Sequence, residues 1–445
     1  MNNIYFSNTE IILLVSLTVL ILLPLRLINP QFKLSFVNPL LIYSLIISYY
    51  CLISPIYRIF TNQTTTRTVD FREFLIYGWF GTLLSLTFLY IGYFFCKQRD
   101  YQKRRISYIK TDQIWKIGFL INVFGILMFL IYSGFDLGFF NPFDNSKAVL
   151  LEFLNYDGPL ESYLLGGQDL LIPGNLLMLT SFIKDRKRKL LTLSTLLITL
   201  GLFLNQGFRF RLFIFTFSIF FFIFISNKFK KSFNKLFIFI GFIGFILFNS
   251  FFELIRTYNG FNFSNLSNFR SSELISALLA PAETDVFFTT SGLISSTPEK
   301  IPFVYQYPLI KAILHPLPSA WVEKGSDHIN DALIMFFGGN HNLAKGAVVL
   351  NIGEYYLMFG WLGIIIGSFI LGFILKKLWI WVLIHYDEPL SIPLYLIHFS
   401  FIFIIISRGY IPQQLNIYAF SILPVTLTYI FYSRKFKKKI IRKIT

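Results

Sequence analysis

Long, nearly uncharged apolar runs recur along the whole chain and restrict its possible folds more than any other feature. A helix needs about 20 predominantly apolar residues to cross a bilayer. Since 55% of the residues are hydrophobic and only 14% are charged, a soluble domain could not bury this much apolar surface. We therefore predict an all-α integral membrane protein, a polytopic bundle of about 11 transmembrane helices. The expected spans are 11–28, 36–56, 74–96, 114–133, 168–183, 190–206, 210–226, 235–253, 347–375, 391–407 and 412–432.

The ninth expected span, 347–375, is long and rich in glycine. Its glycines give it a face of small residues, which permits close contact with a neighbouring helix. We expect this span to begin as a re-entrant segment. The glycines concerned are Gly353, Gly360, Gly363, Gly367 and Gly372.

Charge distribution predicts the topology. The net charge is +17, and the densest basic clusters fall on one side of the membrane if the expected spans alternate. That side is then the cytoplasm, which places the N-terminus outside and the C-terminus inside. The basic excess is therefore a topology signal, and nucleic acid is not an expected partner. The clusters lie at 97–105, 184–189, 228–235 and 434–443.

Arginine and lysine are unevenly divided between the two faces. Lysines dominate the cytoplasmic segments, whereas arginines outnumber lysines on the outer side. The planar guanidinium group binds phosphate and carboxylate in a bidentate manner, which an ammonium group cannot do. This bias favours an anionic ligand on the outer face.

The chain is expected to form one polytopic domain, 1–445, with two large extracytoplasmic segments at 134–167 and 254–345. Within the first, 148–156 has the pattern of an interfacial amphipathic helix. Within the second, 271–281 and 302–318 are expected to form short helices on the bundle. The absence of an internal repeat argues against a transporter built from inverted repeats.

No motif indicates a cofactor or a metal. Two cysteines are too few for a disulfide framework or a zinc site, and no nucleotide-binding or metalloprotease motif is present. Glu283 and Asp285 form an acid-x-acid pair, but such pairs are common by chance. We therefore expect no cofactor and assign no metal site.

Four arginines are candidates for binding an anion. Arg209 and Arg211 stand at the outer entry to the seventh span, where they either snorkel to the interface or pair with outer acids, or else clamp a diphosphate. Arg256 lies three residues after Glu253, which favours a local ion pair over a direct role. Arg408 precedes Gly409 in the turn between the last two spans, which favours an exposed guanidinium.

Glu354 and His341 are the candidate acid–base residues. Glu354 lies in the outer part of the ninth span, and an ionisable residue there is either functional or paired with an arginine. His315, His328 and His341 all lie in the second outer segment, without a metal-ligand spacing. His341 stands just before the ninth span and is the best placed of the three for general-base catalysis.

Three segments resemble the O-antigen (Wzy-type) polymerases of bacterial surface polysaccharide assembly. They are NQGFRFR at 205–211, GAVVLNIGEYYLMFGWLGIIIGSFILG at 346–372 and SRGYIPQ at 407–413. The plan of about a dozen spans with one dominant outer loop is similar as well. The Arg-x10-Gly repeats of some members are missing here.

This resemblance implies that the protein joins oligosaccharide units linked to undecaprenyl diphosphate on the outer face of the inner membrane. The diphosphates would be bound by Arg209, Arg211 and Arg408, with Arg256 less secure. Glu354 or His341 would activate the acceptor hydroxyl. Membrane lipid and a protein that regulates chain length are the implied partners.

Two other functions stay open at this point. The related O-antigen ligases carry a His-Asn motif followed by a glycine, and here Gly353 follows Asn342 one residue later than that motif requires. A ligase would transfer its glycan once. A flippase for lipid-linked oligosaccharides would need a cationic cavity that reaches both faces.

Overall fold

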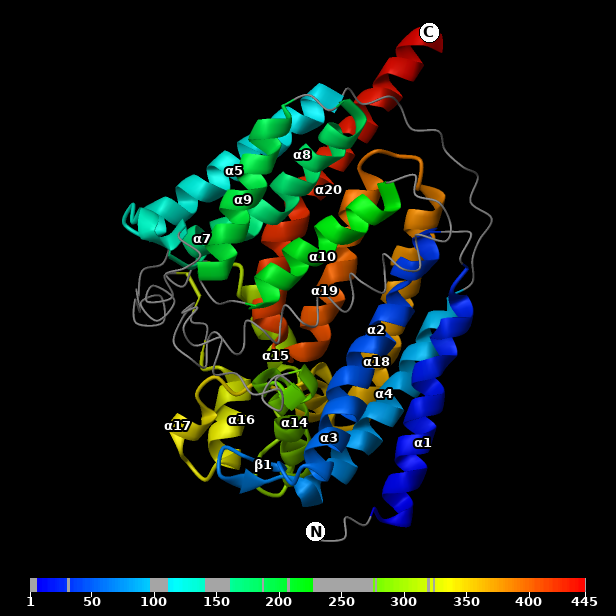
Figure 1. Ribbon diagram of the computed structural model, residues 1–445, viewed down its shortest axis with the longest axis vertical. Coiled ribbons are helices and arrows are strands. Elements are labelled where there is room, and N and C mark those ends of the chain that lie inside the picture. Colours follow the sequence, from blue (N-terminus) through cyan, green and yellow to red (C-terminus); the bar gives the residue numbers. More distant parts are fainter. Residues whose placement is uncertain are drawn as a thin grey trace.

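The computed structural model shows a bundle of long helices with shorter elements gathered at one end (Figure 1). The structure describes residues 6–29, 33–96, 111–140, 161–185, 188–205, 209–226, 275–276, 278–317, 321–322 and 325–444. The first helix of the chain begins at the end that carries the shorter elements, and the last helix ends at the opposite end (Figure 1).

Long helices follow the predicted spans closely. They are α1 (Asn8–Leu22), α2 (Pro39–Ile47) continuing through a π-helical turn into α3 (Ser54–Phe60), α4 (Leu75–Phe95), α5 (Thr111–Tyr132), α8 (Leu171–Asp185), α9 (Lys189–Asn205), α10 (Arg209–Ser226), α18 (Asn351–Ile384), α19 (Ser391–Ser407) and α20 (Ile411–Ile444). The predicted span 235–253 lies outside the described residues.

Six helices of the described part are long and apolar enough to cross a membrane. They cover Asn8–Leu27, Pro39–Phe60, Arg72–Phe95, Asp112–Tyr132, Asn351–Ile384 and Ile411–Tyr432. Three shorter apolar helices, α9, α10 and α19, lie among them. The protein is thus an all-α membrane protein, while the total of eleven spans stays a prediction.

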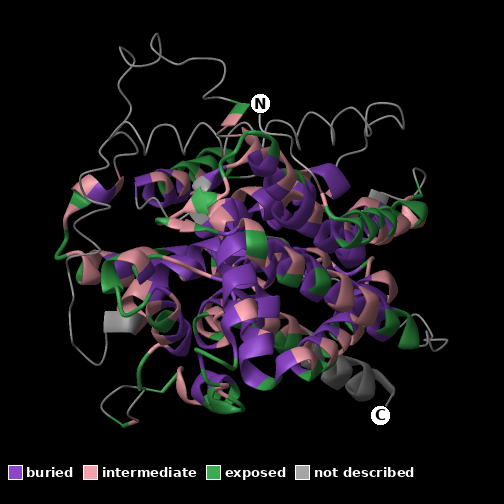
Figure 2. Ribbon diagram, turned by 90° about the horizontal axis from the view of Figure 1, so that it is seen from below, coloured by how far each residue is buried: buried purple, intermediate pink, exposed green. Residues whose placement is uncertain are grey.

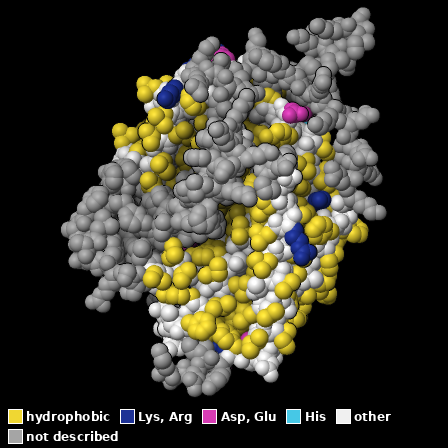
Figure 3. Space-filling model, turned by 45° about the vertical axis from the view of Figure 1, so that its right-hand side comes forward, with side chains coloured by type: hydrophobic (Ala, Val, Ile, Leu, Met, Phe, Trp, Pro, Cys, Tyr) yellow, Lys and Arg dark blue, Asp and Glu magenta, His cyan; other side chains and the backbone are white. Residues whose placement is uncertain are grey.

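The sides of the bundle expose apolar residues in helical stripes. On α18, Leu362, Ile366, Ile370 and Ile374 are each at least half exposed and follow one another at the spacing of one helical turn. Figure 3 shows apolar side chains over much of the described surface in view, with few charged groups. Such a surface suits hydrocarbon and not water.

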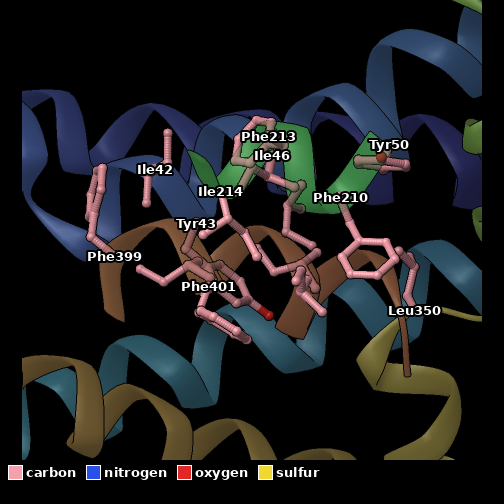
Figure 4. Packing of buried hydrophobic residues seen from close by; sticks show 14 of the residues in the cluster. Ile42, Tyr43, Ile46, Tyr50, Phe210, Phe213, Ile214, Leu350, Phe399 and Phe401 are labelled. Carbon is pink, nitrogen blue, oxygen red and sulfur yellow. The ribbon is translucent and has the colours of Figure 1, made fainter. Parts of the chain in front are cut away.

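Buried residues run through the centre of the bundle and exposed residues surround them, as Figure 2 shows along the helix axes. Aromatic side chains from α2, α10 and α19 form part of this core (Figure 4). The rings of Phe213 and Phe403 stack with centroids 4.0 Å apart, and Phe217 stacks on Phe399 at 5.5 Å. The many phenylalanines of this chain therefore serve packing at these positions.

Glycines allow α4 and α18 to touch backbone to backbone. A Cβ atom added to Gly372 would lie 2.0 Å from the carbonyl oxygen of Leu89, and one added to Gly92 would lie 2.1 Å from that of Phe369. No larger side chain fits at such distances. The small-residue face predicted for the ninth span is therefore a packing surface for α4.

The first two turns of α18 fold back along the rest of that helix. The helix is interrupted at Phe359 and Gly360, and Gly360 has a left-handed φ of 61°, which glycine adopts without steric cost. A Cβ atom on Gly363 would lie 1.9 Å from the carbonyl oxygen of Tyr355, although a continuous helix would separate these residues by about 12 Å. The segment that carries Glu354 is thus a separate short helix.

The second outer segment is more deeply packed than expected. Its helix α14 (Asp285–Ser296) is buried along most of its length and packs on α4, where a Cβ atom on Gly78 would lie 2.0 Å from Ser291 Oγ. The polar residues of α14 escape a burial penalty because they bond to main-chain carbonyls. Thr290 and Ser291, for example, donate to Val286 and Phe287.

The other short elements of this end are α15 (Tyr307–Leu314), α16 (His328–Phe336), α17 (His341–Ala344) and a hairpin of β1 (Thr65–Thr66) and β2 (Val69–Asp70). The short helix α7 (Glu161–Gly166) lies instead beside α5 and α9 (Figure 1). The two strands are antiparallel, with Thr65 opposite Asp70 and Thr66 opposite Val69. The predicted amphipathic helix 148–156 lies outside the described residues, as do residues 271–274 and 277 of the predicted helix 271–281. The prediction of a short helix within 302–318 is confirmed by α15.

Candidate active site at the loop-bearing end

The turn between α19 and α20 lies directly against the start of α18. The N–H of Gly409 donates to the carbonyl of Val349 over 2.7 Å, and a Cβ atom on Gly409 would lie 2.5 Å from the carbonyl oxygen of Leu350. Only glycine permits this approach. The turn that carries Arg408 is therefore fixed to the segment that carries Glu354.

Glu354 is fully buried and joins three elements. Its Oε1 lies 3.1 Å from Nε2 of His328, which begins α16. Both carboxylate oxygens also lie 3.1 Å from the main-chain N–H of Ile411, the first residue of α20. Among the described residues, the side-chain partner of Glu354 is thus a histidine from the outer loop.

Aromatic rings and a lysine surround this carboxylate–imidazole pair. The ring centroid of His328 lies 5.3 Å from that of Tyr410 and 5.9 Å from that of Tyr307. Lys311 Nζ lies 5.6 Å from the Tyr410 centroid and donates to the Ser326 carbonyl. Burial lowers the pKa of Lys311, partly offset by nearby acids, and raises that of the Tyr410 hydroxyl.

Arg211 forms a buried ion pair with Asp169. Its Nε lies 2.7 Å from Asp169 Oδ1, and its terminal nitrogen lies 3.3 Å from Oδ2. The exposed fractions are 6% for Arg211 and 1% for Asp169. Asp169 belongs to the short 3-10 helix Gly167–Leu170 that precedes α8. Pairing with an outer acid, one of the two interpretations of Arg211, is therefore observed.

The ring of Phe210 brings Arg211 and Arg408 together. The guanidinium carbon of Arg211 lies 4.9 Å from the ring centroid, and that of Arg408 lies 5.5 Å from the same centroid. Arg408 is half-buried. Two of the four predicted arginines thus share one neighbourhood, although 197 positions of sequence separate them.

The other predicted site residues are Arg209, Arg256 and His341. Arg209 is the first residue of α10, two positions before Arg211, and Arg256 lies outside the described residues. His341 is exposed at the start of α17, and the loop after it is held by Arg67, which donates to the carbonyls of Leu343 and Lys345.

Asp285 serves the architecture of this end. Arg58 on α3 forms an ion pair with it at 2.6 Å, and Thr66 Oγ1 of the hairpin donates to it over 2.7 Å. Arg58 also donates to the carbonyls of Ala280 and Pro281. Among the described residues, no group of three or more His, Cys, Asp or Glu side chains is placed to hold a metal ion.

The whole chain was compared with models of protein families. The model for the O-antigen polysaccharide polymerase Wzy matches residues 2–439, nearly the entire chain. The chain belongs to this family. It is accordingly a multi-pass membrane protein of polysaccharide biosynthesis. Neither the curated proteins nor the solved structures include a significant match.

Within this Wzy chain, sequence reasoning missed the importance of Asp169 and His328. Asp169 carries the one acidic side chain of the expected fifth span 168–183, which is a usable signal because an intramembrane acid is costly without a partner. His328 had no such signal, since it lies in a polar loop sequence among other histidines. Only the folded chain places it against Glu354.

Proposed function

We propose that this Wzy-family protein polymerises oligosaccharide repeat units linked to undecaprenyl diphosphate. The reaction takes place on the outer face of the bacterial inner membrane, at the end of the bundle formed by α14–α17. The N-terminus then lies outside and the C-terminus in the cytoplasm. Family membership and the basic clusters of the loops support this orientation.

The observation that carries the proposal is the placement of Arg211 and Arg408 on one aromatic ring. Two guanidinium groups that each contact this ring are candidates for binding an anion that bears several charges. Arg408 makes no ion pair with any residue in the described part of the chain. It is therefore the residue we assign to the diphosphate, with Arg211 beside it and Arg209 and Arg256 as further contributors.

The chemistry needs little beyond charge and position. A sugar attached to a diphosphate is already activated, so the protein must stabilise the departing diphosphate, align the acceptor hydroxyl and accept one proton. Guanidinium groups perform the first task. Glu354 and His341 are the predicted proton acceptors, and Glu354 accepts a hydrogen bond from the N–H of Ile411, three positions after Arg408.

The decisive experiment uses purified protein and the lipid-linked repeat unit extracted from cells that lack this protein. The wild-type protein should produce a ladder of products of increasing length. Arg408→Ala should remain in the membrane at normal abundance but lose the ladder, while Arg408→Lys should retain only part of it. Arg26→Ala is the matched control, because Arg26 is exposed near the far end of α1.

Other outcomes point to the alternative functions. A normal ladder from Arg408→Ala would remove the role assigned to that arginine. A product extended only once would indicate a ligase-type transferase. Movement of the substrate between the leaflets of a vesicle without extension would indicate a flippase.

A further inference from the structure

His328 has a buried ring nitrogen without a partner. The side chain is 4% exposed, its Nε2 faces Glu354, and Nδ1 makes no hydrogen bond to any described residue. Buried polar atoms in proteins are nearly always bonded, so an exception calls for an explanation. A nitrogen reserved for a substrate is one such explanation.

We propose that His328 is the proton acceptor for the acceptor-sugar hydroxyl and that Glu354 is its positioning residue. This inference rests on the proposed polymerase function and names a residue that the sequence did not single out. It also changes the role of Glu354 from a direct base to the group that orients one.

The hydrogen bonds of the pair support this division of roles. A carboxylate can only accept, so His328 donates through Nε2–H to Glu354, and Nδ1 then carries the lone pair. Glu354 itself is occupied by His328 and by the N–H of Ile411, and it is fully buried. An imidazole oriented by a buried carboxylate, with a second nitrogen that has no partner in the protein, is the usual arrangement of a general base.

The surroundings place this base beside the proposed diphosphate site. Tyr410 contacts the imidazole ring and is two residues from Arg408, whose turn is fixed by Glu354. Tyr307 contacts the same ring and is 38% exposed. We place the entry of the acceptor sugar at Tyr307, the partly exposed ring that contacts the imidazole.

The proposed step is balanced. The acceptor oxygen forms a bond to the anomeric carbon of the donor while the bond from that carbon to the diphosphate oxygen breaks. The bonding electrons leave with the lipid diphosphate, which Arg408 and Arg211 stabilise. The hydroxyl proton moves to Nδ1 of His328, and Glu354 stabilises the resulting imidazolium.

The test compares His328→Gln, His328→Ala and Glu354→Gln in the purified ladder assay, with measurement of kcat and KM. His328→Gln should lower kcat about 10²–10⁴-fold, the usual contribution of a general base, with little change in KM. Glu354→Gln should lower kcat by a smaller factor. His385→Gln is the control, since His385 follows the other end of α18 and bonds to Trp381.

Chemical rescue separates catalysis from structure. Free imidazole should restore part of the activity of His328→Ala but none of that of His328→Gln, whose side chain fills the space. A folding defect would instead lower both the unfolding temperature and kcat/KM, and free imidazole would not restore the activity. Activity of His328→Gln within a few-fold of wild type would overturn the inference while leaving the polymerase proposal intact. A wild-type protein that produces no ladder would instead refute the proposed function itself.

Discussion

Removal of Asp169 should show how strongly the stability of the bundle depends on the ion pair between Asp169 and Arg211. Both side chains are buried, and two charge-assisted contacts of 2.7 and 3.3 Å join them. Asp169→Ala leaves an uncompensated guanidinium in a low-dielectric interior, which costs about 3–5 kcal/mol of unfolding free energy. Loss of both partners removes that isolated charge, so the double variant should be less destabilised than the sum of the two single variants.

The measurement is a double-mutant cycle on the purified protein. Asp169→Ala, Arg211→Ala and the double variant are unfolded in detergent, and helix content is followed by circular dichroism. The coupling energy should lie toward the upper end of the range of about 0.5–3 kcal/mol for residues in contact. Lys116→Ala is the matched control, because its pair with Asp112 is exposed and should contribute nothing measurable.

Two results would refute this reasoning. Additive effects of the single variants would show that the two charges do not stabilise each other. Asp169→Ala with wild-type stability but altered activity would instead show that Arg211 serves the ligand alone, so that the buried contact is incidental to folding.

Three further changes test particular contacts by the same unfolding measurement. Gly409→Ala should cost about 1–3 kcal/mol because its Cβ atom would meet the Leu350 carbonyl at 2.5 Å; wild-type stability would contradict this. Gly372→Ala should also destabilise, since 2.0 Å separates its Cβ position from the Leu89 oxygen, although alanine normally favours a helix. Burial lowers the pKa of Lys311 below its normal value of 10.5. At pH values between these two pKa values the unfolded chain binds more protons than the folded chain, so the free energy of unfolding should rise with pH. Lys311→Met should abolish that rise, and an unchanged slope would assign it to another group.

Most of the helical framework could be predicted because hydropathy is a property of contiguous residues. The expected span 391–407 coincides with α19, and the expected span 210–226 differs from α10 by one residue. Helix α14 escaped prediction because Thr289, Thr290 and Ser291 interrupt its apolar pattern. Their hydroxyls bond to carbonyls of the helix itself or of the segment before α18, so the helix can be buried in spite of them.

The candidate site could be predicted only in part. Arg408 and Glu354 were found because an arginine in an outer turn and an acid in an apolar span are unusual in themselves. Their partners were not found. Asp169 is 42 residues from Arg211, and His328 is 26 residues from Glu354, separations at which no local pattern links two side chains.

The sequence by itself determined that this chain occupies a membrane, where its main helices lie and which family it belongs to. Those properties follow from the hydropathy of contiguous residues and from short sequence motifs. Only the tertiary structure decided that Glu354 holds His328, that Phe210 joins Arg211 to Arg408, and that α18 folds back at Gly360. The physical reason is that a buried charge must find a partner wherever packing provides one, and packing joins residues without regard to their distance along the chain.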